Sequence, residues 1–165
     1  MHTDNSLKAL KSFDQSVWLD YLHRELLRSG ELQRQLEQDG VCGVTSNPAI
    51  FREAIAGSDA YHEAILTLVR SGADVSGIYL GLVRDDVRAT ADLLKDCYER
   101  SDGRDGYVSL EVSPHLAHDY EATVEEARKL WELIDRPNLM IKVPATDEGC
   151  QALSLLIEEG INVNA

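Results

Sequence analysis

Short apolar runs alternate with longer segments of helical periodicity along most of the chain, and this alternation limits the fold more than any other feature of the sequence. Short runs between turn residues predict buried strands, and apolar residues spaced three or four apart predict amphipathic helices. The predicted strands are Val17–Tyr21, Val41–Asn47, Tyr107–Val112, Leu139–Ala145 and Ile161–Ala165. The predicted helices cover residues 22–38, 49–69, 75–99, 116–134 and 147–159, with breaks expected at Gly30 and near Gly57, a cap at Asp147 and an end at Gly160.

Strands that are separated by helices are joined by right-handed crossovers, so this order predicts a parallel α/β sheet. Both an open, doubly wound sheet and a (β/α)8 TIM barrel fit the pattern. No glycine-rich phosphate loop of the Rossmann or P-loop type follows any predicted strand, which disfavours the open sheet. The pattern therefore favours the barrel.

The composition is that of a globular protein and restricts its partners. With 165 residues, of which 44% are hydrophobic and 27% charged, we expect residues 1–165 to form one domain. The formal net charge of −13 argues against a nucleic-acid or membrane-surface partner, because both present phosphate groups. A small phosphorylated substrate stays possible, since a few Arg or Lys side chains can reverse the field locally.

The cysteines and the apolar runs indicate the compartment. Cys42, Cys97 and Cys150 are odd in number and lack the spacing of metal ligands, so we expect reduced thiols. The first ten residues hold no apolar run that could serve as a signal peptide, and no later run is long enough to span a bilayer. These features predict a soluble, cytoplasmic protein.

Side-chain parity along the strands is the most informative feature for function. Successive residues of a strand point to opposite faces. Each predicted strand has one largely apolar face and carries polar groups on the other, near its C-terminal end. In a barrel that face points to the interior near the mouth, where such enzymes place their sites. The residues expected to converge there are Asp20, Asn47, Glu111, Lys142 and Asn164, and Thr45 shares the face of Asn47.

Each of these residues also has a structural interpretation. Asp or Asn at a strand end is most often a helix cap or a turn residue. Lys142 lies in an apolar strand and could form a structural ion pair with Glu111 or Asp20. Alternatively, desolvation lowers the pKa of Lys142, and the neutral amine can then attack a carbonyl carbon.

A lysine with a carboxylate on each side suits Schiff-base chemistry, because Asp20 and Glu111 could move the protons of the intermediates. A metal site is not expected, since no His or Cys shares this face and the lysine would repel a cation. Trp18 is expected either to line the barrel floor or to fill the core. The histidines expected at solvated or capping positions are His23, His62, His115 and His118.

Three segments resemble the transaldolase family. VTSNPAIF (Val44–Phe51) resembles the TNP-type signature, and MIKVPATDEG (Met140–Gly149) resembles the strand that carries the Schiff-base lysine. GINVN (Gly160–Asn164) resembles the start of the strand that follows. Their order and spacing agree with the family over essentially the whole chain.

The resemblance implies a (β/α)8 barrel without cofactor or metal. It implies transfer of a dihydroxyacetone unit from sedoheptulose 7-phosphate to glyceraldehyde 3-phosphate, in the non-oxidative pentose phosphate pathway. Lys142 matches the imine-forming lysine, Asp20 the acid that handles the proton during carbon–carbon cleavage, and Glu111 the acid that works through a catalytic water. Asn47 and Asn164 match asparagines that bind the ketose hydroxyls, with Thr45 beside them.

Two alternatives to a working transaldolase follow from the same residues. Fructose-6-phosphate aldolases are similar but generally have Gln where this chain has Glu111, which favours the transferase. A barrel of this type needs eight strands, whereas the sequence predicts five, so the barrel domain is expected to be incomplete at its C-terminus. A chain that truly ends at Ala165 is expected to lack the phosphate-binding arginines and to show no measurable turnover.

Overall fold

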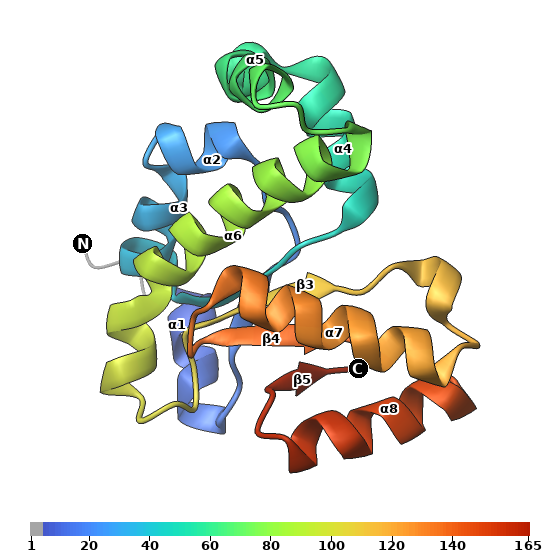
Figure 1. The fold of residues 1–165 in the computed structure, drawn as a ribbon. Helices are drawn as coiled ribbons and strands as arrows, with labels where there is room; N and C mark the ends of the chain where they lie inside the picture. Colours follow the sequence, from blue (N-terminus) through green and yellow to red (C-terminus); the bar gives the residue numbers. More distant parts are fainter. Residues whose placement is uncertain (1–4) are drawn as a thin grey trace.

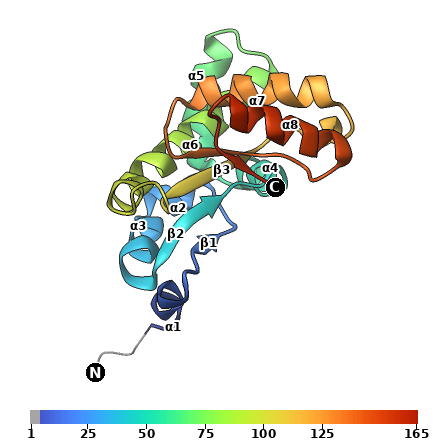
Figure 2. The same cartoon turned by 90° about the horizontal axis from the view of Figure 1, so that it is seen from below.

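The structure is a computed structural model and describes residues 5–165 of the chain. Its strands are Val17–Leu19 (β1), Val41–Thr45 (β2), Tyr107–Glu111 (β3), Leu139–Lys142 (β4) and Val163–Asn164 (β5). They form one parallel five-stranded sheet in the order β1-β2-β3-β4-β5, the same as along the chain (Figures 1 and 2). A doubly wound sheet reverses its strand order at a switch point, whereas a barrel adds each new strand on the same side. The sheet is therefore part of a (β/α)8 barrel, as predicted.

Helical segments connect the strands. The α-helices are Ser6–Ala9 (α1), Arg24–Arg28 (α2), Glu31–Arg34 (α3), Pro48–Gly57 (α4), His62–Arg70 (α5), Val75–Arg100 (α6), Tyr120–Ile134 (α7) and Asp147–Glu158 (α8). Short 3₁₀ turns cover Leu10–Phe13, Asp59–Tyr61 and Pro114–Leu116, and Gln35–Asp39 is π-helical. Within residues 5–165, no helix combines the length and apolar character that crossing a membrane requires.

All five predicted strands are confirmed, but each is shorter than predicted. After β2 and β4, Ser46 and Val143 still donate to the carbonyls of Ser109 and Asn164, each at 2.9 Å. The pairing ends before Pro48 and Pro144, which have no N–H group to donate to a neighbouring strand. Asn47, predicted as the last residue of a strand, instead precedes Pro48 as the cap of α4.

The helix boundaries bring two corrections. The cap of α8 is Thr146 and not Asp147, since the Thr146 hydroxyl accepts a hydrogen bond from the Gly149 amide at 3.0 Å. The helix predicted over 116–134 begins only at Tyr120, because Asp119 caps it there. The break at Gly30 is confirmed, and this glycine has a φ of 75°, in the left-handed region.

One face of the sheet packs against α6, α7 and α8 and forms the core (Figures 1 and 2). Its residues alternate along the strands as the parity predicts, and their side chains are buried. The sheet contributes Val44, Val108, Leu110, Leu139 and Ile141, and the helices contribute Val87, Ala91, Leu94, Ala127, Leu130, Ile134, Ala152 and Leu156.

The opposite face of the sheet carries the polar residues, and Trp18 of β1 also lies on that face. Trp18 of β1 lies directly beside Gly43 of β2 in the sheet register. A Cβ atom at Gly43 would lie 2.3 Å from the indole ring, so the ring occupies the space that any larger residue would need. Trp18 therefore lies on the inner face of the sheet, at the level of Gly43.

The three cysteines are free thiols among the described residues. Burial raises the pKa of the Cys42 thiol and of the Cys97 thiol, and Asp105 adds to both shifts. A raised pKa lowers the thiolate fraction at neutral pH, so these two partly buried cysteines behave as small, unreactive side chains.

Candidate active site

Three of the predicted site residues lie side by side at the C-terminal ends of neighbouring strands. Glu111 of β3 is the register partner of Lys142 in β4, and Lys142 is the register partner of Asn164 in β5. The Lys142 ammonium nitrogen lies 3.7 Å from Oε2 of Glu111. The geometry therefore brings an amine, a carboxylate and an amide to one level of the barrel interior.

The surroundings of Lys142 combine buried chain neighbours with a partly exposed lysine side chain. Its chain neighbours Ile141 and Val143 point to the core and are buried, as the parity predicts. The Lys142 side chain itself is 36% exposed, and the Glu111 side chain is 20% exposed. Of the two interpretations of Lys142, the described residues show the contact with Glu111, and the lysine side chain keeps part of its surface accessible. A reagent from solvent can reach this amine.

Asp20 lies apart from this cluster. It follows the last residue of β1 and is exposed. Two strands, β2 and β3, separate β1 from β4 in the sheet. Among residues 5–165, no side chain forms a hydrogen bond or ion pair with its carboxylate. The ion pair that Lys142 forms is with Glu111 and not with Asp20.

Asn47 has the capping role that the structural interpretation allowed. Its side-chain oxygen accepts a hydrogen bond from the Ala49 amide at 2.8 Å, and Pro48 occupies the first position of α4. The cap uses only the carbonyl oxygen of the side chain. The amide NH₂ group remains able to donate to a ligand.

Ser109, the neighbour of Thr45 in the sheet, is a further candidate site residue that was not predicted. Thr45 of β2 is the register partner of Ser109 in β3. Both hydroxyl groups are buried and have no hydrogen-bond partner among the described residues. Ser109 shares the face of Glu111 by parity, and this was the signal that could have identified it. Two buried hydroxyls without partners are costly unless a ligand or water binds them.

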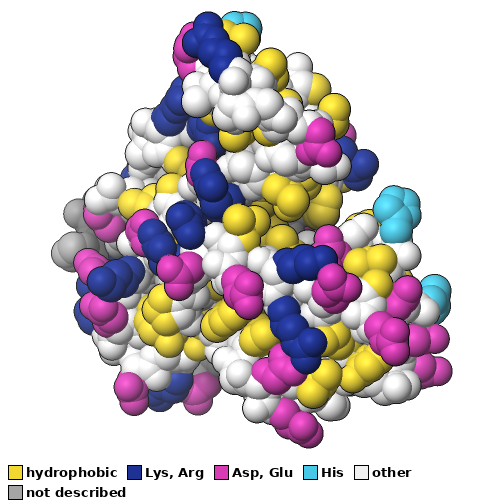
Figure 3. All heavy atoms as spheres, in the orientation of Figure 1, with side chains coloured by type: hydrophobic (Ala, Val, Ile, Leu, Met, Phe, Trp, Pro, Cys, Tyr) yellow, Lys and Arg dark blue, Asp and Glu magenta, His cyan; other side chains and the backbone are white. Residues whose placement is uncertain are grey.

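A pocket of about 230 Å³ opens beside Glu111, on the helix side of the site. Apolar side chains from α4, α6 and α7 form its floor, and Figure 3 shows hydrophobic groups in the hollow above α7. Tyr79 lines this pocket, and burial raises the pKa of its hydroxyl; the Glu111 carboxylate adds to the shift and Arg52 opposes it. Lys142 is not among the lining residues, so the pocket adjoins the site without containing the amine.

Comparisons with known proteins identify the family of the chain. Residues 17–165 match the sequence model of the family described as Transaldolase/Fructose-6-phosphate aldolase. A transaldolase of Thiobacillus denitrificans is 52% identical over 160 residues, which cover 97% of this chain and 45% of that protein. Transaldolase 2 of Nostoc punctiforme is 48% identical over 97% of this chain and 42% of its own length. A transaldolase of Mycobacterium tuberculosis is 47% identical over 96% of this chain and 43% of its own length.

The matches extend over nearly all of this chain but over less than half of each relative. The matched residues 17–165 include Asp20, Glu111 and Lys142. The chain belongs to the transaldolase/fructose-6-phosphate aldolase family.

Proposed function

We propose that the protein that carries this chain is a transaldolase. It forms an imine on Lys142 and transfers a dihydroxyacetone unit from sedoheptulose 7-phosphate to glyceraldehyde 3-phosphate. The observation that carries the proposal is the 3.7 Å approach of the Lys142 amine to the Glu111 carboxylate at the C-terminal end of the sheet. Sugar phosphates are its substrates, and it works without cofactor in the non-oxidative pentose phosphate pathway of the cytoplasm.

The first step joins the substrate to the protein. The neutral amine of Lys142 adds to the ketose carbonyl carbon, and the carbinolamine loses water to give an iminium ion. Glu111 is near enough to donate protons to the carbinolamine oxygen, and to accept them from it, through one water. Asn164, next to Lys142 in the register, donates from its side-chain amide to a ketose hydroxyl.

The second step breaks a carbon–carbon bond. Asp20 accepts the proton of the hydroxyl on the fourth carbon, the bond between the third and fourth carbons breaks, and the electron pair moves into the iminium to form an enamine. The aldehyde leaves, and the enamine on Lys142 then attacks the acceptor aldehyde. Asn47 and the hydroxyls of Thr45 and Ser109 bind the hydroxyls of the retained fragment, which satisfies the two buried groups that lack partners.

Borohydride trapping tests the role of Lys142. We expect treatment of the natively expressed protein with sedoheptulose 7-phosphate and borohydride to add a reduced dihydroxyacetone unit to Lys142, located by peptide mass spectrometry. Lys142→Met removes the adduct. Lys129→Met, which changes an exposed lysine paired with Glu125, is the matched control and leaves the adduct in place. Modification of another lysine, with Lys142 unmodified, would refute the assignment.

A product measurement separates transfer from simple aldol cleavage. Because position 111 is Glu, we expect transfer to an added aldehyde acceptor to be faster than release of free dihydroxyacetone. Glu111→Gln should shift the ratio towards release. Release of free dihydroxyacetone at the same rate with and without acceptor would assign a lyase activity instead.

A further inference from the structure

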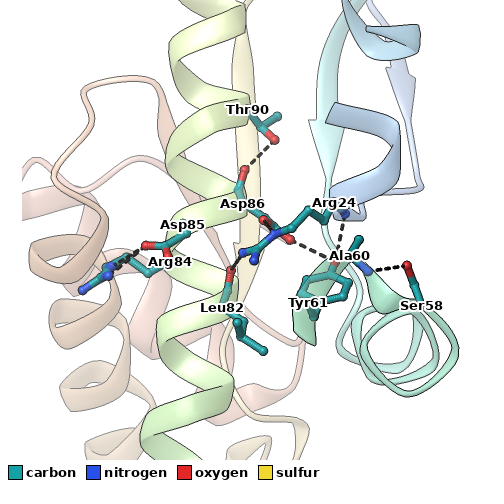
Figure 4. A network of polar contacts seen from close by, with 9 residues as sticks. All are labelled: Arg24, Ser58, Ala60, Tyr61, Leu82, Arg84, Asp85, Asp86 and Thr90. Atoms are coloured by element: carbon teal, nitrogen blue, oxygen red, sulfur yellow. Dashed lines mark hydrogen bonds and ion pairs between the residues drawn. The ribbon is translucent and has the colours of Figure 1, made fainter. Parts of the chain in front are cut away.

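A closed ring of polar contacts joins α2, the 3₁₀ turn Asp59–Tyr61 and α6 (Figure 4). The backbone amide of Arg24 donates to the Tyr61 hydroxyl at 2.9 Å, and this hydroxyl donates to Oδ2 of Asp86 at 2.9 Å. The other carboxylate oxygen, Oδ1, accepts from Nε of Arg24 at 2.7 Å. The ring therefore begins at the main chain of Arg24 and returns to its side chain.

All three residues of the ring are buried, with exposed fractions of 8% for Arg24, 0% for Tyr61 and 3% for Asp86. The Arg24 guanidinium also lies 4.6 Å from the centre of the Tyr61 ring. Burial raises the pKa of Asp86, and the nearby guanidinium opposes that shift. A buried ion pair of this kind adds little net stability compared with apolar residues of the same size, so stability alone does not account for it.

The ring holds the start of α2, and α2 follows the segment that carries Asp20. His23, the residue before α2, supplies no side-chain cap, so the Tyr61 hydroxyl satisfies the free Arg24 amide. On the other side of the segment, Leu19 is paired with Val44 in the sheet. Residues 20–23 are therefore held at both ends, by β1 and by the ring, and Leu22 between them is fully buried.

Asp20 has no side-chain partner among the described residues, so its position is set by the main chain of this segment. From this arrangement we infer that Arg24, Tyr61 and Asp86 are positioning residues that hold Asp20 in place for proton transfer. The inference rests on the proposed function, in which Asp20 accepts the proton during carbon–carbon cleavage. A displacement of about 1 Å of a reacting group can lower a rate by about 100-fold, so loss of the ring should affect cleavage.

Tyr61→Phe is the test, because it removes only the hydroxyl that links the Arg24 amide to Asp86. Tyr107→Phe is the matched control: its partly buried hydroxyl donates to the Gly103 carbonyl at 2.7 Å, at the N-terminal end of β3, whereas Asp20 follows the C-terminal end of β1. Two rates are measured in the natively expressed protein. One is borohydride-trapped imine formation on Lys142, which does not need Asp20, and the other is aldehyde release in a single turnover.

We expect Tyr61→Phe to slow aldehyde release by about tenfold or more while trapping on Lys142 stays within about twofold of wild type. Tyr107→Phe should change neither rate. In an Asp20→Asn background, Tyr61→Phe should cause no further loss, because the residue that it positions is already missing. Hydrogen exchange should show faster exchange of the Arg24 amide in Tyr61→Phe but not in Tyr107→Phe.

Equal loss of aldehyde release in Tyr61→Phe and Tyr107→Phe would overturn the inference while leaving the proposed function intact, as would a full additional loss in the Asp20→Asn background. Absence of trapping on Lys142 in the wild type would overturn the proposed function and the positioning role with it. If Tyr61→Phe does not fold, Asp86→Asn replaces it, since it keeps the shape of the side chain but removes its charge and replaces one acceptor oxygen of the ring by an NH₂ group.

Discussion

Gly149 lies in the first turn of α8, where the helix passes over the loop that follows the strand of Lys142. A Cβ atom at this position would lie 1.8 Å from the carbonyl oxygen of Pro144. Atoms that are not bonded to each other stay about 3.5 Å apart, so the main chain of the loop or of the helix would have to move by about 1–2 Å. Pro144 lies only two residues after Lys142, and the movement would therefore reach the amine.

We predict that Gly149→Ala lowers the free energy of unfolding by about 1–3 kcal/mol, the usual cost of forcing extra volume into a packed site. For a chain of this size that corresponds to a melting temperature lower by about 3–10 °C. Urea unfolding followed by far-UV circular dichroism measures the first quantity and a thermal scan the second. Gly57→Ala is the control, because no atom lies within 4 Å of its Cβ position, and it should be neutral or slightly stabilising. Equal stabilities for the two variants would refute the steric argument.

Two further predictions concern ion pairs. Asp86→Ala should lower the free energy of unfolding by about 3–5 kcal/mol, because it leaves the buried Arg24 charge without a partner. The double variant Arg24→Met/Asp86→Leu should lower it by less than the sum of the two single changes. Urea unfolding measures both. On the surface, Arg136 holds the pKa of the Asp92 carboxyl below its ordinary value of 3.8, so the pair stabilises the folded state above that pH, and the stabilisation is lost as the pH falls through the lowered pKa. Asp92→Asn should therefore cost less than about 1 kcal/mol at pH 7, and its difference from wild type should shrink below pH 4; a constant difference would contradict the linkage.

The order of the strands and the direction of their side chains could be predicted from the sequence because both follow from local patterns. Parity placed Glu111, Lys142 and Asn164 on one face, and the parallel register placed them at one level. The exposed fraction of the Lys142 side chain could not be predicted from the sequence pattern, because it depends on what covers the inner face of the sheet. The sequence left open a structural ion pair and a desolvated amine at Lys142, and the described residues show its contact with Glu111 at 3.7 Å.

Hydrogen bonds between a polar side chain and residues far away in the sequence could not be predicted either. Asn138 is 2% exposed, and its side-chain amide donates to the carbonyls of Ala91 and Gly106 at 2.9 and 2.8 Å. The ring at Arg24 is similar, because Asp86 lies 62 positions further along the chain. Periodicity places Asp86 on a helix face but does not reveal which residue of another element it meets.

The contact between Trp18 and Gly43 has a consequence for how this barrel can vary between relatives. The indole ring fills the space beside Gly43, so the two positions share one volume across β1 and β2. A larger residue at 43 becomes tolerable only when the residue at 18 becomes smaller. We therefore expect the two positions to covary among homologues, with Ala or Ser at 43 accompanied by a small side chain at 18. Libraries that diversify one position should diversify the other at the same time.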